Sequence, residues 1–315
     1  MILVGGGSGF FGFNVARCLA DRGKEVLLVQ RHPIDAPSLL ARHWGHEVRQ
    51  AVGDLLDLPC ILGLVKQFKI ESIIHAAHMT SGVRHEYGYE PDLHQTVQVQ
   101  TEGLMNCLEA ARIMDLRRVT FVSSVDLYRG WPKQCDVWHE DAYLPPVTFS
   151  DIGNKKRAGE GICFLYNARY GVSVASARIG HNYGPGCDWH SLNVMIANAL
   201  SGTESNFPDI PENMRRHTVY ARDSAEGACR IHLADSLKHY IYNVSDGDHP
   251  TMGEIARTIG EILPGARLRL GPQKGEEAEY RPVSMERMKE EFGFVPLNIR
   301  QGIEAQVAFL KDGLY

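Results

Sequence analysis

Short apolar segments alternate with amphipathic ones along the first part of the chain. Segments of strand length are found at Met1–Val4, Glu25–Val29, Glu47–Val52, Ser72–Ala76 and Val119–Val122. Helical spacing marks Phe13–Arg22, which places its apolar residues on one face and is followed by Gly23, and also Leu104–Ile113. This alternation predicts βαβ units, and therefore a parallel sheet that helices cover on both faces.

Three glycines lie between the first predicted strand and the first predicted helix. Gly6, Gly9 and Gly12 have the spacing GxxGxxG. A turn of this kind needs residues without Cβ, the backbone must approach a pyrophosphate, and the start of a helix favours negative charge. The position of the glycines, after a strand and before a helix, indicates a dinucleotide site.

Two further positions support a dinucleotide. Asp54 and Leu55 follow the third strand, where a carboxylate and an apolar side chain can flank an adenine ring, and Ala76-Ala77 closes the fourth strand with small residues. The alternative interpretation is that Asp54 only caps the next helix and that the two alanines only pack.

Composition excludes several classes of protein. The chain has 315 residues, a net charge of −5 and no basic run, so nucleic acid is not an expected partner. No apolar run approaches the ~20 residues that cross a bilayer, and the N-terminus has the character of a strand rather than a signal peptide, so we expect a cytoplasmic protein. The histidines lack metal-ligand spacing, and no metal site is predicted. The cysteines are odd in number and form no CxxC pair, which suits a reducing compartment: Cys18, Cys60, Cys107, Cys135, Cys163, Cys187 and Cys229.

Motifs along most of the chain resemble those of the extended short-chain dehydrogenase/reductases, in particular the nucleotide-sugar epimerase and dehydratase branch. The matching segments are ILVGGGSGFFG (2–12), GDLLD (53–57), IIHAAH (73–78), NCLEAAR (106–112), FVSSVDLY (121–128), Lys156 with Glu160, ARIGHNYGPG (177–186) and RHTVYARDSAEG (216–227).

The resemblance implies an α/β protein: a Rossmann-type doubly wound parallel sheet with a smaller C-terminal α/β substrate lobe. Residues 1–178 would form the NAD(P)-binding domain, 216–247 would return to it, and 179–315 would mainly form the substrate lobe. A homodimer joined by a four-helix bundle is implied, with helices at about 92–113 and 154–170. The implied substrate is a nucleoside diphosphate sugar or a related polyol, and residues 200–216 are expected to form a flexible loop over its pocket.

The resemblance also assigns residues to the cofactor and the substrate. Cofactor contacts are expected from Gly6, Gly9, Phe10, Phe11, Gly12, Gln30, Arg31, Asp54, Leu55, Ala76, Ala77, His78, Ser123 and Lys156. Substrate contacts are expected from Ser124, Tyr183 and Arg216, the last toward a diphosphate, with a surface salt bridge as its alternative role. Asp223 is expected to tie the two lobes together.

The end of the second strand bears on the choice between NAD and NADP. An acidic residue there would bind the ribose 2′-hydroxyl, but this chain has Gln30 followed by Arg31. A neutral amide beside a guanidinium favours NADP over NAD, since arginine binds phosphate in a bidentate way. Gln30 could also bond a ribose hydroxyl while Arg31 points to solvent.

The proton-transfer tyrosine of the family is absent. In the family a tyrosine lies four residues before the lysine, one turn earlier on the same helix face, and takes a proton from the substrate hydroxyl. Counting back from Lys156 gives Ile152, which has no proton to move. Ser124 still occupies the position of the catalytic hydroxyl.

Three interpretations follow. The first is an active enzyme whose acid–base group comes from elsewhere, with Asp126 as the best candidate and His78, His181 and Tyr183 as others. The second is a protein that binds NAD(P) without catalysis, as a sensor or a partner-binding module. The third is a reaction, such as an elimination, that needs no phenol. We expect an enzyme with Ser124, Lys156, Asp126 and His181 as its catalytic residues.

Overall fold

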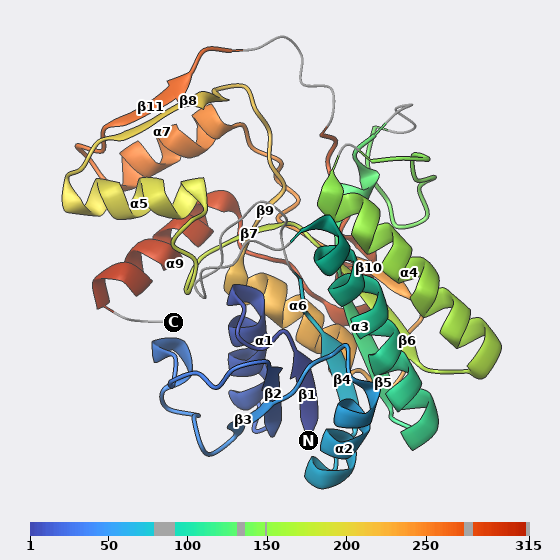
Figure 1. Ribbon diagram of the computed structural model, residues 1–315. Coiled ribbons are helices and arrows are strands. Elements are labelled where there is room, and N and C mark those ends of the chain that lie inside the picture. The colour runs from blue at the N-terminus through green and yellow to red at the C-terminus, as the bar shows by residue number, and fades with distance from the viewer. Residues whose placement is uncertain (79–91, 131–135, 149, 274–279, 313–315) are drawn as a thin grey trace.

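Seven parallel strands form the central sheet, in the order β10-β6-β5-β4-β1-β2-β3 (Figure 1). The computed structural model describes residues 1–78, 92–130, 136–148, 150–273 and 280–312, so Cys135 lies outside the described residues. The strands are β1 (Ile2–Gly5), β2 (Val26–Gln30), β3 (Val48–Val52), β4 (Ser72–His75), β5 (Arg118–Ser124), β6 (Val174–Ile179) and β10 (Ile241–Val244). Their order confirms the predicted Rossmann-type sheet, in which β10 pairs with β6 at one edge.

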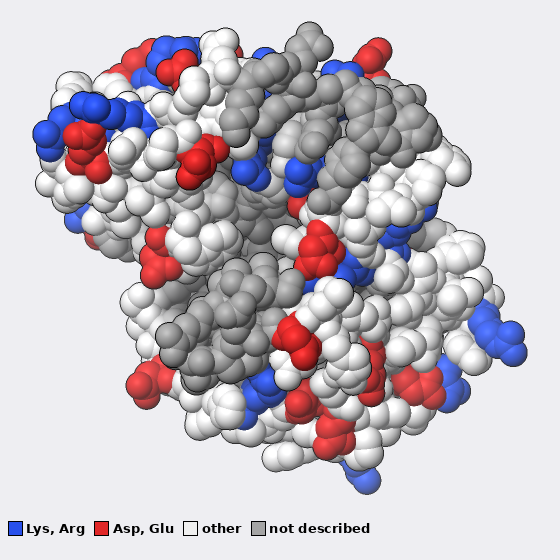
Figure 2. All heavy atoms as spheres, turned by 45° about the horizontal axis from the view of Figure 1, so that its top comes forward, with Lys and Arg blue, Asp and Glu red and all other residues white. Residues whose placement is uncertain are grey.

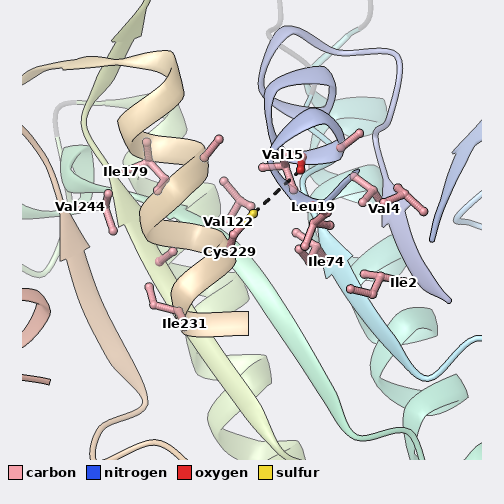
Figure 3. Packing of buried hydrophobic residues seen from close by; sticks show 14 of the residues in the cluster. Ile2, Val4, Val15, Leu19, Ile74, Val122, Ile179, Cys229, Ile231 and Val244 are labelled. Carbon is pink, nitrogen blue, oxygen red and sulfur yellow. Dashed lines mark hydrogen bonds between the residues drawn. The ribbon is translucent and has the colours of Figure 1, made fainter. Parts of the chain in front are cut away.

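Helices cover both faces of this sheet because the strands are apolar on both sides. One face packs against α2 (Leu58–Phe68), α3 (Leu93–Met114) and α4 (Asp151–Tyr170). The opposite face packs against α1 (Phe10–Ala20), α6 (Ala221–Leu233) and α8 (Glu286–Phe292). Figure 3 shows this second layer from close by, with Val15 and Leu19 of α1 facing Cys229 of α6 above the sheet.

A smaller lobe lies beyond the carboxyl ends of the strands (Figure 1). It contains α5 (Ser191–Ser201), β8 (Ser205–Pro211), α7 (Met252–Ile262), β11 (Leu268–Gly271) and α9 (Ile299–Asp312), which share a separate apolar core. Two short strands, β7 (His181–Tyr183) and β9 (Thr218–Tyr220), pair with each other between the lobes. Two 3₁₀ turns complete the elements, η1 (Ser38–Leu40) and η2 (Val125–Tyr128).

One sequence-based expectation about this lobe is wrong. Residues 200–216 do not form a flexible loop, because 205–211 form strand β8, which pairs in parallel with β11. Pro208 and Pro211 suggested a loop, yet β8 has a single neighbour in its sheet, and prolines are tolerated in such an edge strand.

The starts of two helices differ from the bounds that hydrophobic spacing predicted, and α3 agrees instead with the helix at about 92–113 that the resemblance implied. Helix α1 begins at Phe10 rather than Phe13, directly after Gly9, and α3 extends back to Leu93. Asp223 on α6 accepts a hydrogen bond from the Leu297 amide at 2.8 Å, which ties α6 to the segment that precedes α9. Within the described parts of the chain, no helix is both long and apolar enough to cross a bilayer.

Candidate active site

The glycine turn between β1 and α1 is closely packed. Gly6 has φ +81°, and a Cβ at this residue would lie 2.5 Å from the Ala77 Cα. A Cβ at Gly12 would lie 2.4 Å from the Gly6 carbonyl oxygen. Gly9 precedes α1 and brings no side chain to cap it. The first N–H groups of α1 are therefore left for an outside acceptor, as an anion-binding turn requires.

Gln30, at the end of β2, is held by a second glutamine. Its Nε2 donates to Gln50 Oε1 at 2.6 Å, and Gln50 is fixed in turn by two hydrogen bonds with the Ile34 backbone, at 2.8 and 3.0 Å. Gln30 is 6% exposed, and its buried Oε1 has no partner among the described residues. A buried acceptor at this position fits a hydroxyl donor better than a phosphate oxygen. Arg31 is exposed beside it.

The Asp54-Leu55 pair follows β3. Asp54 Oδ1 accepts from the Leu56 amide at 3.0 Å, while Asp57 caps α2 by accepting from the Cys60 amide. The capping role considered for Asp54 therefore belongs to Asp57. Leu55 packs against Gly5 at the end of β1, where its Cδ1 lies 3.0 Å from the position of a Cβ.

Two buried residues, Lys156 and His75, and the half-buried His78 lie between β4, α3 and α4. Lys156 Nζ lies 5.0 Å from the centroid of the Phe121 ring, and burial together with the Lys155 charge lowers the pKa of Lys156 to about 7. His78 Nδ1 lies 3.3 Å from Gln100 Oε1. Burial and then Lys156 lower the pKa of His78, and likewise that of His75, to about 3. Both histidines are therefore neutral near pH 7.

Glu160, four residues after Lys156, belongs to a buried network. Its Oε1 accepts from Ser123 Oγ at 2.7 Å, and its two oxygens accept from Arg178 at 2.9 and 2.7 Å. Arg178 also donates to the Tyr128 hydroxyl at 2.6 Å. The network joins α4 to β5 and β6 and sets the position of the helix that carries Lys156. Ser123 was expected to contact the cofactor, and the structure shows its hydroxyl bonded to Glu160. The role of Arg178 as the partner of Glu160 was not predicted from the sequence.

Asp126 and His181 form a pair at the carboxyl ends of β5 and β6. Asp126 Oδ1 lies 3.0 Å from His181 Nε2, and its Oδ2 accepts from Ser150 Oγ at 2.7 Å. Burial opposes ionisation of this carboxyl, yet the His181 hydrogen bond and the Arg129 charge hold the pKa of Asp126 well below its usual range. An ionised carboxylate only accepts, so His181 Nε2 must carry a proton toward Asp126, and the neutral tautomer that fits this contact has its lone pair on Nδ1.

The start of α4 lies against this pair. Ser150 caps α4 by accepting from the Gly153 amide at 3.2 Å while it donates to Asp126. Ile152 is half-buried in the first turn of the helix, one turn before Lys156. Ser124 Oγ accepts from the Asp126 amide at 3.1 Å. The structure therefore places a carboxylate–imidazole pair beside the helix turn that contains Ile152.

Two residues expected to bind substrate lie in different surroundings. Tyr183 is 2% exposed and packs against Tyr220 and Gly302 in the core of the smaller lobe, apart from the Asp126–His181 pair. Arg216 is half-buried. Burial, then the neighbouring His181 and Arg216, lower the pKa of His190 to about 3, so both residues lie near the His190 ring.

Sequence reasoning also missed an aromatic cluster next to His181. It consists of Trp138, His217, His249 and Tyr280, and the Tyr280 ring lies 6.4 Å from the His181 ring. Figure 2 shows both basic and acidic side chains around the hollow between the two lobes. No group of three or more His, Cys, Asp or Glu with the arrangement of a metal site occurs in the described ranges.

Known proteins resemble this chain in sequence and in fold. Residues 2–245 match the NAD dependent epimerase/dehydratase family. A dTDP-4-dehydro-6-deoxy-D-allose reductase from a Streptomyces species is 26% identical over 96% of this chain and 94% of its own length. The UDP-glucose 4-epimerase of Thermotoga maritima, solved with UDP-glucose, has a TM-score of 0.82 at 19% identity, covering 100% of this chain and 99% of the other.

A third comparison is with MoeE5, solved with UDP-glucuronic acid and NAD. It has a TM-score of 0.80 at 21% identity and covers 99% of each chain. At such identities the two solved structures confirm the fold, while the family match covers most of the chain. This protein belongs to the NAD dependent epimerase/dehydratase family.

Proposed function

We propose that this protein is an enzyme that transfers hydride between NAD and the sugar of a nucleoside diphosphate sugar, with His181 moving the proton in place of the missing tyrosine. The observation that carries the proposal is the 3.0 Å contact between Asp126 Oδ1 and His181 Nε2, beside the α4 turn that holds Ile152. The substrate class is supported by the relatives and neighbours, which are named for dTDP- and UDP-sugars.

The chain's own groups divide the work. His181 Nδ1 would take the proton of the reacting hydroxyl, and Asp126 would orient the imidazole and stabilise its protonated form. Ser124 would hydrogen-bond the same substrate oxygen, and Lys156 would bind the ribose next to the nicotinamide. The cofactor, when bound, supplies the hydride acceptor. A positioned base of this kind contributes about 10²–10⁴-fold to a rate.

The cofactor we propose is NAD, against the preference for NADP that the sequence suggested. The buried Gln30 Oε1 needs a donor, which a ribose hydroxyl has and a 2′-phosphate lacks. The exposed Arg31 favours the 2′-phosphate of NADP. Replacing Arg31 separates its contribution to cofactor choice from that of Gln30. We expect wild type and Arg31→Ala both to bind NAD more tightly than NADP, and Gln30→Leu to lose affinity for NAD.

We also propose that two copies of the chain associate through α3 and α4, which pack against each other (Figure 1). Leu93, Val97 and Met105 are exposed at intervals of four or eight residues along α3, and Phe164 and Leu165 are exposed on α4. Apolar faces on two adjacent helices suit burial against a second copy of the same pair.

The experiment starts from purified protein. The dinucleotide released by denaturation is identified, and the native protein is then mixed with UDP-glucose, UDP-glucuronic acid and dTDP-sugars while the absorbance of reduced nicotinamide is followed. One sugar should change the absorbance, and His181→Gln and Asp126→Asn should slow that change by about 10²–10⁴-fold. Exposed His46→Gln is the matched control and should leave the rate unchanged. If cofactor is bound but no sugar changes its redox state, the protein binds NAD without catalysis and the proposal fails.

A further inference from the structure

Two histidines beside the proposed catalytic pair stack on each other. His217 directly precedes β9 and His249 lies between β10 and α7, and their ring centroids are 4.6 Å apart at an interplanar angle of 12°. They are 1% and 6% exposed. The Nε2 atom of each is buried and has no hydrogen-bond partner in the described part of the chain. Buried polar atoms are nearly always paired, so two unpaired atoms in one cluster indicate a ligand.

The groups around the pair carry a surplus of positive charge. On the His217 side, Trp138 and Tyr280 contact the ring at 5.1 and 5.3 Å, and the charges of Asp126 and Arg129 act on it with opposite signs. Asp126 is already engaged by His181 and Ser150.

On the His249 side lie two arginines and the Asp246 carboxyl, which accepts a hydrogen bond from the His249 amide and whose pKa burial raises to about 7. Arg215 Nη1 donates to the His249 carbonyl at 2.6 Å, and the same atom lies 4.0 Å from Glu254 Oε2. Arg281 also acts on the His249 ring, and its buried Nε has no hydrogen-bond partner in the ranges that the structure describes. Three unpaired buried nitrogens among arginines favour a negatively charged ligand.

We propose that His217, His249 and Arg281 bind an anionic oxygen group of the substrate, and that the histidine pair takes up one proton as the group binds. The inference rests on the proposed function, because it places this group in the same cleft as the Asp126–His181 pair. His249 has φ +53°, a backbone conformation that a side chain other than glycine adopts infrequently, which suits a ring held in place for a ligand.

Proton uptake follows from the charge of the two histidine rings. Burial, and to a smaller extent the neighbouring His249 and His181, lower the pKa of His217 well below its usual value. Burial, then Arg215 and Arg281, lower the pKa of His249 to about 4. Both rings are therefore neutral near pH 7. An anion raises the pKa of the nearest ring, because it stabilises the charged form. Binding should therefore tighten as the pH falls from the bound pKa toward the free one.

The position of the pair limits the source of the anion. Tyr280 contacts both the His217 and the His181 rings, so the anion lies near the reacting sugar. Either a carboxylate on that sugar or the diphosphate that carries it could supply the oxygens, and the two share the same chemistry.

Calorimetric titration of the NAD-loaded protein tests the inference without requiring turnover. UDP-glucuronic acid, UDP-glucose and UDP are titrated near pH 7 in two buffers with different ionisation enthalpies, which gives the number of protons taken up. Uptake with UDP-glucuronic acid alone assigns the anion to a sugar carboxylate, and uptake with all three assigns it to the diphosphate. Either result supports the site. Absence of uptake with every ligand that binds overturns it.

Variants separate the pair from its neighbours. His249→Gln and His217→Gln should each weaken binding about tenfold and remove the proton uptake, whereas His181→Gln should retain it. Thermal unfolding and NAD affinity show whether each variant is folded. Unchanged uptake in both folded variants contradicts the inference. The experiment measures binding, so the anion site can be confirmed even if no sugar changes the redox state of the cofactor.

Discussion

Arg178 on β6 binds both carboxylate oxygens of Glu160 on α4, at 2.9 and 2.7 Å, within the buried layer between helix and sheet. Glu160→Gln would remove the negative charge and leave the Arg178 guanidinium buried without its counter-ion. Removing one partner of a buried ion pair costs about 3–5 kcal/mol. We expect a loss of this size in the free energy of unfolding, measured by urea denaturation.

An exposed ion pair provides the control for that prediction. Glu109 and Arg112 lie three residues apart on α3, with their closest atoms 2.6 Å apart and both side chains partly exposed to solvent. Glu109→Gln should change the free energy of unfolding little, since exposed pairs are screened by water. Equal, small effects of the two substitutions would show that Arg178 does not depend on Glu160.

Gly12→Ala should abolish NAD binding, because its Cβ would lie 2.4 Å from the Gly6 carbonyl oxygen and force the phosphate-binding turn to move. Gly63→Ala on α2 is the matched control, since nothing lies within 4 Å of its Cβ position. That substitution should leave NAD affinity unchanged and stabilise the helix by up to ~1 kcal/mol. Titration with NAD checks both, and normal affinity in Gly12→Ala would refute the assignment of the turn.

Lys156 should make stability depend on pH. Burial lowers the pKa of Lys156 from 10.5 to about 7, so between these values the unfolded chain binds a proton that the folded protein does not. The free energy of unfolding should therefore rise with pH across this window. From pH 7 to pH 9 the rise should be roughly 2 kcal/mol larger in wild type than in Lys156→Met. Denaturation of the NAD-free protein measures it, and equal pH dependence of the two proteins would mean that Lys156 stays charged.

The proposed association through α3 and α4 predicts a change of mass on substitution. Phe164→Glu with Leu165→Glu would place charges in the apolar face of α4, and we expect the dimer to dissociate into monomers. Light scattering coupled to size exclusion measures the mass. Val295→Glu, at an exposed apolar residue outside both helices, should leave the dimer intact. A monomeric wild type would contradict the proposal.

The sheet was predictable because its strands are buried on both faces and therefore appear as short apolar runs. The family resemblance is likewise confirmed. Asp126 and His181 were each candidates from sequence. Their contact requires β5 and β6 to be neighbours, so that the carboxyl ends of the two strands meet at one edge of the sheet. The order of the strands along the chain does not predict this pairing.

Other features depended on tertiary contacts. His217 and His249 lie in different segments, and nothing in either segment indicates that their rings stack. In the sequence, Arg178 is a charged residue within an apolar strand, and nothing nearby indicates that Glu160 on α4 is its partner. The division into residues 1–178 with 216–247 and residues 179–315, and the cytoplasmic location, stay predictions.

The central claim is that the Asp126–His181 pair does the work of the absent tyrosine. Ile152 lies half-buried one turn before Lys156, so Ile152→Tyr would place a phenol where the sequence analysis expected the tyrosine. The most direct measurement is the single-turnover rate of hydride transfer in wild type, His181→Gln and the double variant His181→Gln with Ile152→Tyr. We predict that His181→Gln slows transfer by about 10²–10⁴-fold and that the added tyrosine recovers much of the loss. A His181→Gln variant that transfers hydride at the wild-type rate would contradict the account.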